Sequence, residues 1–402
     1  PLPDPASKAS KSAMAAFSSR NWLLLLASAR ALAPSSQWRP LPDVAPSDDR
    51  FVTTRRGAAA ALGAATLGAK RAFAAGTRRV ATVQSWPRIP VWPTWGGGRV
   101  IPMSLDARRA DPFLLVAHHK HWFDPRDPLR GPFRAVGGAL GLPYVDVEGF
   151  SMHPHRGFDI LTYVLDGSDG FRHRDSLGGE RTYRGGSAQF MRAGRGAMHE
   201  EFWETRDDRR TSVELFQVWI NLPRRRKMDD PSIRYLGADF AAPFRETVAV
   251  DDAGRRTRVR HVLDGAILDA ATDGEGATPR PRPRADVLHA TLQPGATWAP
   301  EVGSDATAMV YCRTGRVVVP GPGGRAQAID AGESAIYLPD GGAATAATCA
   351  NPTSAEADVL LFAGAKLREP VAAGGPIVMN TEAELEEAYA ELRAGTFLKR
   401  VS

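Results

Sequence analysis

The sequence predicts an all-β protein with two barrel or sandwich domains, and three observations support this. Short apolar runs recur along the chain between Gly, Pro and Asp residues. The 39 Gly and 31 Pro residues favour turns over long helices. A length of 402 residues is typical of two domains. Many short strands separated by turn signals indicate a sandwich or a barrel.

The positive charge of the chain lies in one segment. The formal net charge is +6, and residues 1–74 hold ten Lys/Arg against four Asp/Glu. Residues 75–402 hold 41 of each kind and are therefore neutral. Because the body of the protein has no net charge, we expect no direct binding of nucleic acid.

Residues 1–74 have the features of a targeting leader that is removed. Arg20 precedes the apolar run 22–26 and the small residues 27–29, which is typical of a secretory signal and too short to span a bilayer. The twin arginines at 55–56, an apolar run and Ala72-Phe73-Ala74 resemble a twin-arginine export signal. In this order the segments predict a plastid protein, with the thylakoid lumen as the finer expectation. The alternative is a protein of cytoplasm or nucleus whose Ala- and Arg-rich start imitates such signals. No stable membrane span is expected.

Residues 84–222 form the first predicted domain. Its apolar runs predict strands at 99–102, 113–117, 160–165, 188–191 and 213–220. The run at 213–220 is apolar at both odd and even positions, which indicates a strand buried on both faces. Glycines at 167–170 and 177–179 predict hairpin turns.

Two short motifs in this domain have the composition of a metal site. His153 and His155 are separated by one residue, and His199 and Glu201 repeat this spacing. Alternate residues of a strand point to the same face, so two such strands facing each other would bring four side chains to one point. Three imidazoles and a carboxylate suit a divalent first-row transition metal. Fe(II) is the leading candidate, and Mn, Ni, Cu or Zn are alternatives.

A rival histidine cluster lies at His118, His119 and His121. His119 and His121 also have strand spacing, but no second pair accompanies them and the turn-forming sequence Asp124-Pro-Arg-Asp-Pro follows at once. We interpret them as residues of the first-barrel surface, or as neighbours of the metal ligands.

The second half of the chain predicts a connecting segment, a second domain and a terminal helix. Segment 223–284 contains a basic run at 224–227, interpreted as a solvated loop, and a low-complexity stretch at 271–284. Strands are predicted at 257–262, 286–292, 307–312, 316–319 and 335–338. His289 is the only histidine of the second domain, 285–398, and is expected to serve packing, so this domain should be metal-free. Thr381 and Glu384 form a capping box, and Gly395 can end the helix.

The two cysteines, Cys312 and Cys349, fit no metal-binding spacing. We interpret them as buried small hydrophobic residues. The sequence is also compatible with a disulfide bond between these two cysteines.

Taken together, the motifs resemble the pirin family of the cupin superfamily. The resemblance lies in His153-Pro-His-Arg-Gly-Phe-Asp159, in His173-Arg-Asp-Ser-Leu-Gly178 and in the glycine turn before His199-x-Glu201, and it extends over about residues 84–398. It implies two cupin β-barrels (double-stranded β-helices) in tandem with a short C-terminal helix. The family usually has Pro-Gly-Asp where this chain has Gly185-Gly-Ser187, a change that keeps a turn-permissive glycine.

The resemblance also implies roles for individual residues. His153, His155, His199 and Glu201 match the four metal ligands of the family. Asp159 takes a position where many other cupins place an acidic ligand, but where pirins do not. His173, Arg156 and Arg195 are expected to be structural, and Glu200 to point away from the metal.

Two functions follow from the resemblance. Some pirins resemble quercetinases, which implies a quercetin 2,3-dioxygenase-type oxygenase acting on a flavonol-like aromatic substrate, with Glu201 both a ligand and the catalytic base. The alternative is a non-enzymatic, metal- or redox-dependent regulatory or stress-response protein that binds a protein partner. We expect a monomer.

Overall fold

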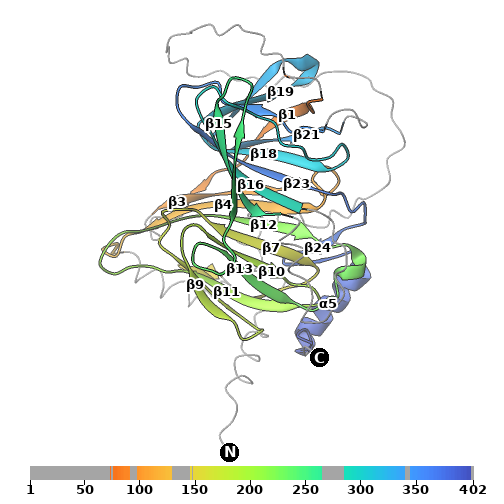
Figure 1. Ribbon diagram of the computed structural model, residues 1–402. Helices are drawn as coiled ribbons and strands as arrows, with labels where there is room; N and C mark the ends of the chain where they lie inside the picture. Colours follow the sequence, from red (N-terminus) through yellow and green to blue (C-terminus); the bar gives the residue numbers. More distant parts are fainter. Residues whose placement is uncertain are drawn as a thin grey trace, which may run out of the picture.

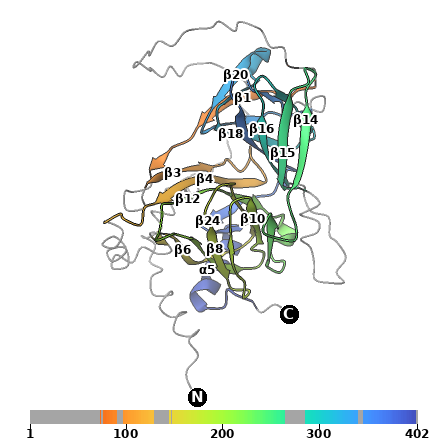
Figure 2. The same cartoon turned by 60° about the vertical axis from the view of Figure 1, so that its left-hand side comes forward.

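A computed structural model describes residues 73, 76–90, 97–128, 145–146, 148–264, 285–339 and 345–399. Within these ranges the chain forms stacked β-sheets and one α-helix (Figures 1 and 2). The prediction of an all-β fold with two barrels and a C-terminal helix is confirmed. Apart from Phe73, the predicted leader 1–74 lies outside the described residues, as does the low-complexity stretch 271–284.

The first barrel is built from a seven-stranded and a five-stranded sheet. The larger sheet has the order β13-β10-β7-β12-β4-β3-β2, and the smaller one has the order β5-β6-β11-β8-β9. The strands of the larger sheet are β2 (Ile89–Pro90), β3 (Gly98–Ser104), β4 (Phe113–Phe123), β7 (Phe158–Val164), β10 (Ser187–Arg192), β12 (Thr211–Asn221) and β13 (Ser232–Gly237). Those of the smaller sheet are β5 (Val145–Asp146), β6 (Gly149–His155), β8 (Phe171–Asp175), β9 (Glu180–Tyr183) and β11 (Ala197–Trp203).

The second barrel repeats this design with a seven-stranded and a four-stranded sheet, in the orders β1-β21-β18-β23-β16-β15-β14 and β17-β22-β19-β20. The strands of its larger sheet are β1 (Val80–Ser85), β14 (Arg245–Val250), β15 (Arg256–Leu263), β16 (Ala285–Leu292), β18 (Thr307–Thr314), β21 (Glu333–Tyr337) and β23 (Ala357–Gly364). Those of its smaller sheet are β17 (Thr297–Trp298), β19 (Arg316–Pro320), β20 (Ala326–Asp330) and β22 (Cys349–Ala350). A 3-10 turn, η5 (Pro322–Gly324), joins β19 to β20.

Two parts of the chain connect the barrels in a way that the sequence does not reveal. Strand β1 precedes the first barrel in the sequence but pairs with β21 of the second. The segment 223–284 contains β13, which pairs with β10 of the first barrel, and β14 and β15, which belong to the second. The chain therefore crosses between the barrels more than once.

The two large sheets pack face to face and form the centre of the molecule (Figure 1). Their shared core contains buried side chains from both barrels, among them Val116 and Phe216 of the first and Met309 and Phe362 of the second. Strand β12 is buried on both faces, as predicted, because one face lines the first barrel and the other contacts the second. This arrangement places the walls of the first barrel in direct contact with the second.

After the second barrel, the C-terminal segment returns to the first. Strands β24 (Ala372–Gly374) and β25 (Ile377–Met379) form a ribbon, and helix α5 (Glu382–Ala394) packs on it through Leu385 and Ala388. The predicted capping box is confirmed: Thr381 accepts a hydrogen bond from the Glu384 amide, and Gly395 ends the helix in the left-handed conformation. None of the helices in the described part of the chain is long and apolar enough to cross a membrane.

Most predicted strands are confirmed, but two local interpretations are wrong. Residues 167–170 do not close a hairpin, because β7 and β8 lie in different sheets and the turn carries the chain from one to the other. The basic run 224–227 is not a solvated loop. It forms the 3-10 turn η4 (Arg224–Arg226), and both Arg226 and Lys227 are buried.

The cysteines follow the expectation. Cys312 and Cys349 are buried and free, and no disulfide joins them. Both contribute to the core of the second barrel.

Candidate metal centre

Two adjacent antiparallel strands, β6 and β11, position the four residues of the predicted metal site. His153 on β6 lies directly opposite His199 on β11. The register then shifts, so that Glu201 lies opposite Phe150. Side chains of β11 alternate between buried and half-buried from Ala197 to Trp203, which points both His199 and Glu201 into the barrel.

The three histidines come close together inside the barrel, and Glu201 lies beside His199. The Nε2 atoms of His155 and His199 are 3.0 Å apart, and Nε2 of His199 is 3.9 Å from a carboxylate oxygen of Glu201. The rings of His153 and His199 have centroids 4.4 Å apart. Candidate ligand atoms of His153, His155 and His199 all lie within 4.8 Å of one another.

Hydrogen bonds orient the side chains. Nδ1 of His153 donates to the carbonyl of Ser151 at 2.8 Å, so in the neutral ring Nε2 carries the lone pair. Glu201 is held by the opposite sheet, because one carboxylate oxygen accepts from the Thr162 hydroxyl at 3.2 Å and the other from the Gln217 amide at 3.0 Å.

Burial sets the protonation state of the cluster. It lowers the pKa of His153 to about 4 and the pKa values of His155 and His199 well below the usual value, and it raises the pKa of Glu201. The imidazoles are therefore neutral near pH 7, which is the form that binds metals. Nδ1 of His199 is buried without a hydrogen-bond partner among the described residues. Three neutral imidazoles and a fixed carboxylate fit a divalent transition metal.

The strand that carries His155 ends against the C-terminal ribbon. Gly157 has a φ of +87°, and a Cβ atom there would lie 1.9 Å from the carbonyl oxygen of Val378. Only glycine fits this position. The neighbouring Arg156 is buried, binds Glu391 of α5 at 2.7 Å and lies over the Phe397 ring. Its predicted structural role is confirmed, and the C-terminal segment thereby supports the strand end.

The other charged residues near the motifs lie as expected. Glu200 points away from the site and pairs with Arg174, and Arg195 pairs with Asp230. Asp159 is buried beside Arg192, with a separation of 4.0 Å between the charged groups. It belongs to none of the candidate metal-binding groups of the described residues.

His173 lies closer to the site than the sequence suggests. A ligand atom of its ring is within 4.8 Å of those of His199 and Glu201. Its Nε2 contacts Asp175 at 3.0 Å, and the Gln189 amide approaches the same ring. These contacts hold the His173 ring beside the candidate metal centre.

In the rival cluster, His118 and His121 are buried and His119 is half-buried, so the interpretation of the cluster as surface is wrong. Strand β4 runs through all three histidines and ends at Phe123, and the predicted turn follows at Asp124, whose carbonyl accepts from the Asp127 amide. His118 faces the second barrel and contacts Tyr311, at 2.8 Å, and Glu214. His119 and His121 face the interior of the first barrel.

Sequence reasoning missed Thr162 and Gln217, the two residues that hold Glu201. Both lie on the larger sheet, far in sequence from the histidine motifs, and neither has a distinctive spacing. The one available signal is Gln217, a polar residue at an otherwise apolar position of β12.

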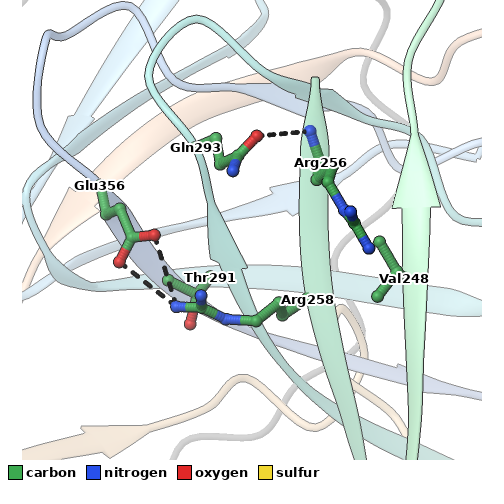
Figure 3. Close-up of a pocket in the computed structure, with 6 residues that line it drawn as sticks. All are labelled: Val248, Arg256, Arg258, Thr291, Gln293 and Glu356. Carbon is green, nitrogen blue, oxygen red and sulfur yellow. Dashed lines mark hydrogen bonds and ion pairs between the residues drawn. The ribbon is translucent and has the colours of Figure 1, made fainter. Parts of the chain in front are cut away.

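A separate pocket of about 310 Å³ lies on the second barrel, over β14, β15 and β16 (Figure 3). It is lined by Val248, Arg256, Arg258, Thr291, Gln293 and Glu356. Arg258 pairs with Glu356 inside it. The pocket offers positive charge and hydrogen bonds, and none of its lining residues belongs to the candidate metal-binding groups of the described residues.

The fold and the site define a protein of the cupin class, with two barrels and a candidate metal centre in the first. Comparison with known proteins is more specific. The pirin family model matches residues 101–220, and the model of the pirin C-terminal cupin domain matches residues 287–398. The chain belongs to the pirin family.

Individual relatives support this assignment. The chain is 33% identical to a pirin-like protein of Caulobacter vibrioides over 62% of this chain and 80% of the relative. It is 29% identical to human pirin over 72% and 83% of the two chains. Among solved structures, a quercetin 2,3-dioxygenase from Acinetobacter baumannii superposes with a TM-score of 0.59 and 25% identity, over 80% of this chain and 98% of the other.

Proposed function

We propose that the protein is a mononuclear metal oxygenase of the quercetin 2,3-dioxygenase type, which acts on a flavonol-like aromatic substrate. His153, His155, His199 and Glu201 would hold one divalent transition metal, with Fe(II) the leading candidate. The observation that carries the proposal is the buried Glu201 carboxylate, which Thr162 and Gln217 fix 3.9 Å from His199, the imidazole that also clusters with His153 and His155. The similarity to a solved quercetin dioxygenase supports the substrate class.

A divalent metal with open coordination positions would supply a binding place for substrate and O₂. Glu201 would take the proton of the enolic hydroxyl at one of its carboxylate oxygens. Thr162 and Gln217 donate to these oxygens and keep the carboxylate directed toward His199. Trp219 donates from its indole N–H to Gln217 at 3.3 Å, which fixes the amide in turn. Phe158 and Trp219 pack their rings against His155 and would help to exclude water from the site.

The test compares two neighbouring carboxylates. Glu201→Gln removes the proposed base, whereas Glu200→Gln changes a carboxylate that points outward and pairs with Arg174. With metal-loaded protein and quercetin, we expect Glu200→Gln to consume O₂ like the wild type. Glu201→Gln should lose at least about 100-fold in rate, the scale of general base catalysis.

Metal content is measured in parallel for both variants. A Glu201→Gln variant that retains metal and full oxygen uptake would contradict the role of Glu201. Metal-loaded wild type without any flavonol-dependent oxygen uptake would contradict the enzymatic proposal and favour the regulatory alternative.

A further inference from the structure

The interior of the first barrel contains polar side chains beyond the metal site. On β12, Gln217 faces the interior, and Ala117 of β4 lies opposite it. Two residues further along β4, His119 points to the same face and lies opposite Leu215. On β11, Trp203 follows Glu201 by two residues and points inward with it. His119 and Trp203 thus form the next layer of the barrel.

His119 and Trp203 are neighbours, with ring centroids 6.3 Å apart. Nδ1 of His119 is hydrogen-bonded to Nε2 of His121 at 3.1 Å. The His121 ring in turn packs on Trp203, with centroids 4.8 Å apart. His121 is almost fully buried, whereas His119, which faces the same way, is only half-buried and keeps part of its side chain accessible.

Two nitrogen atoms in this layer lack partners within the ranges that the structure describes. The indole N–H of Trp203 is buried and donates to no acceptor. Nε2 of His119 also makes no hydrogen bond there, because the single bond of this ring is the one from Nδ1 to His121. A buried N–H without an acceptor is costly, by about 1–3 kcal/mol. The Trp203 N–H therefore favours a nearby acceptor, and Nε2 of His119 is a second polar atom on the neighbouring ring.

The chemistry of the two nitrogens selects a hydroxyl group. Burial lowers the pKa of His119 to about 3, so the ring is neutral near pH 7. The pair His119–His121 shares one proton in its hydrogen bond, which leaves Nε2 of His119 as either a donor or an acceptor. The Trp203 N–H is only a donor. A hydroxyl group can donate one hydrogen bond and accept two, so it satisfies both residues in either tautomer.

We propose that His119 and Trp203 form a binding subsite for a hydroxyl group on the distal ring of an aromatic ligand whose reacting end lies at Glu201. The inference rests on the proposed function, since that function places the reacting end. Two residues along a strand span about 7 Å. This separation between the layer of Gln217 and the layer of His119 is comparable with the length of a substituted phenyl ring.

The test is an equilibrium binding measurement without O₂, so that turnover is not needed. Full-length, metal-loaded protein is titrated with 3-hydroxyflavone and with its derivative that has a hydroxyl group at the 4′ position. We expect the wild type to bind the hydroxylated flavonol about tenfold more tightly, the value of one hydrogen bond. His119→Leu should remove this preference without changing the affinity for 3-hydroxyflavone. His119→Gln, which retains a hydrogen-bonding group, should keep most of it.

The outcomes separate the two proposals. Equal binding of both flavonols by the wild type, or an unchanged preference in His119→Leu, overturns the subsite while the oxygenase proposal stands. Binding of neither flavonol overturns both. Metal content is measured for each variant. Trp203→Phe removes the other hydrogen-bonding atom and tests the subsite independently if His119→Leu does not fold. The Trp203→Phe variant should also lose the preference, and if it retains the full preference the subsite is overturned.

Discussion

Tyr163 and His289 hydrogen-bond across the boundary between the two barrels, with 2.9 Å between the phenol oxygen and Nδ1. His289 then binds Asp358 at 2.9 Å through Nε2, and Asp358 accepts from Arg313 at 2.8 Å. Arg313 reaches back to Glu214 of the first barrel at 3.2 Å. The expectation that His289 serves packing is therefore wrong, since it joins a polar network that connects the barrels.

This network lies directly behind the candidate metal centre. Tyr163 follows Thr162 on β7, and Thr162 points the opposite way, to Glu201. Glu214 lies on β12, the strand that also carries Gln217. The strands that hold the carboxylate of the site are thus fixed on their other face by the second barrel. That the second domain binds no metal stays a prediction. Its role would then be to fix the strands of the first barrel.

Removal of the Tyr163 hydroxyl should destabilise the protein. In Tyr163→Phe, His289 and Arg260 both lose a buried partner. We expect a loss of about 1–3 kcal/mol in the free energy of unfolding, measured by urea denaturation. Tyr235→Phe is the matched control, because the Tyr235 hydroxyl is buried without a partner among the described residues. A Tyr163→Phe variant as stable as this control would contradict the role of the network.

Glu214 should make stability dependent on pH in the acid range. Burial alone would raise the pKa of Glu214, but the hydrogen bond from His118, the charge of Arg313 and the hydrogen bond from Lys120 outweigh it and lower the pKa to about 2. In the unfolded chain this carboxyl has its ordinary pKa of 4.5. The stabilisation is therefore complete above pH 4.5 and is lost as the pH falls toward 2.

The measurement compares urea denaturation of wild type and Glu214→Gln between pH 7 and pH 3. At pH 7 the variant should be less stable by roughly 1–3 kcal/mol, and the difference should shrink as the solution becomes more acidic. Glu386→Gln, at an exposed position of α5, serves as the control and should show no such trend. A difference that is constant over this range would contradict the assignment.

The candidate metal centre can be tested by metal content and thermal stability, without any measurement of catalysis. Wild type should bind about one divalent metal per chain, and the double variant His153→Ala/His155→Ala should bind none, as measured by elemental analysis. Bound metal should also raise the thermal midpoint of the wild type, since a ligand of the folded state stabilises it. His261→Ala, which changes a histidine of the second barrel, should keep both properties. Equal metal content in all three proteins would place the metal elsewhere.

The sequence predicted the fold class and the four clustered residues well, for physical reasons. Strand spacing alone places His153 and His155 on one face, and the same holds for His199 and Glu201. The residues that complete the site come from other strands, and their contacts depend on the sheet order, which local patterns do not contain. Thr162, Gln217 and His119 are examples.

Buried charges were the other weakness of sequence reasoning. Lys227 looks like part of an exposed basic run, yet its ammonium group donates to the carbonyls of Gly157 and Val378 and to Asn221. These acceptors lie up to 151 residues away. Charge patterns predict exposure by default, and only the tertiary contacts reverse this. The plastid location, predicted from the leader, stays a prediction.

The buried Arg78 should be as important for the second barrel as a core residue. Its guanidinium group donates to the carbonyls of Ala306 at 2.8 Å and of Leu338 and Tyr337 at 3.0 Å each, although its neighbours in sequence resemble a basic leader. Arg78→Met should leave these acceptors unpaired and reduce stability by about 2–4 kcal/mol in urea denaturation.

Arg79→Met is the matched control for this change, because the side chain of Arg79 is exposed next to it. The control should remain within about 0.5 kcal/mol of the wild type, as is usual for surface substitutions. If both variants were equally stable, the strand β1 and the residues before it would not be anchored by Arg78. If Arg78→Met alone is destabilised, any removal of the leader must leave Arg78 on the mature chain. Its side chain supplies the hydrogen bonds to the carbonyl groups of the second barrel.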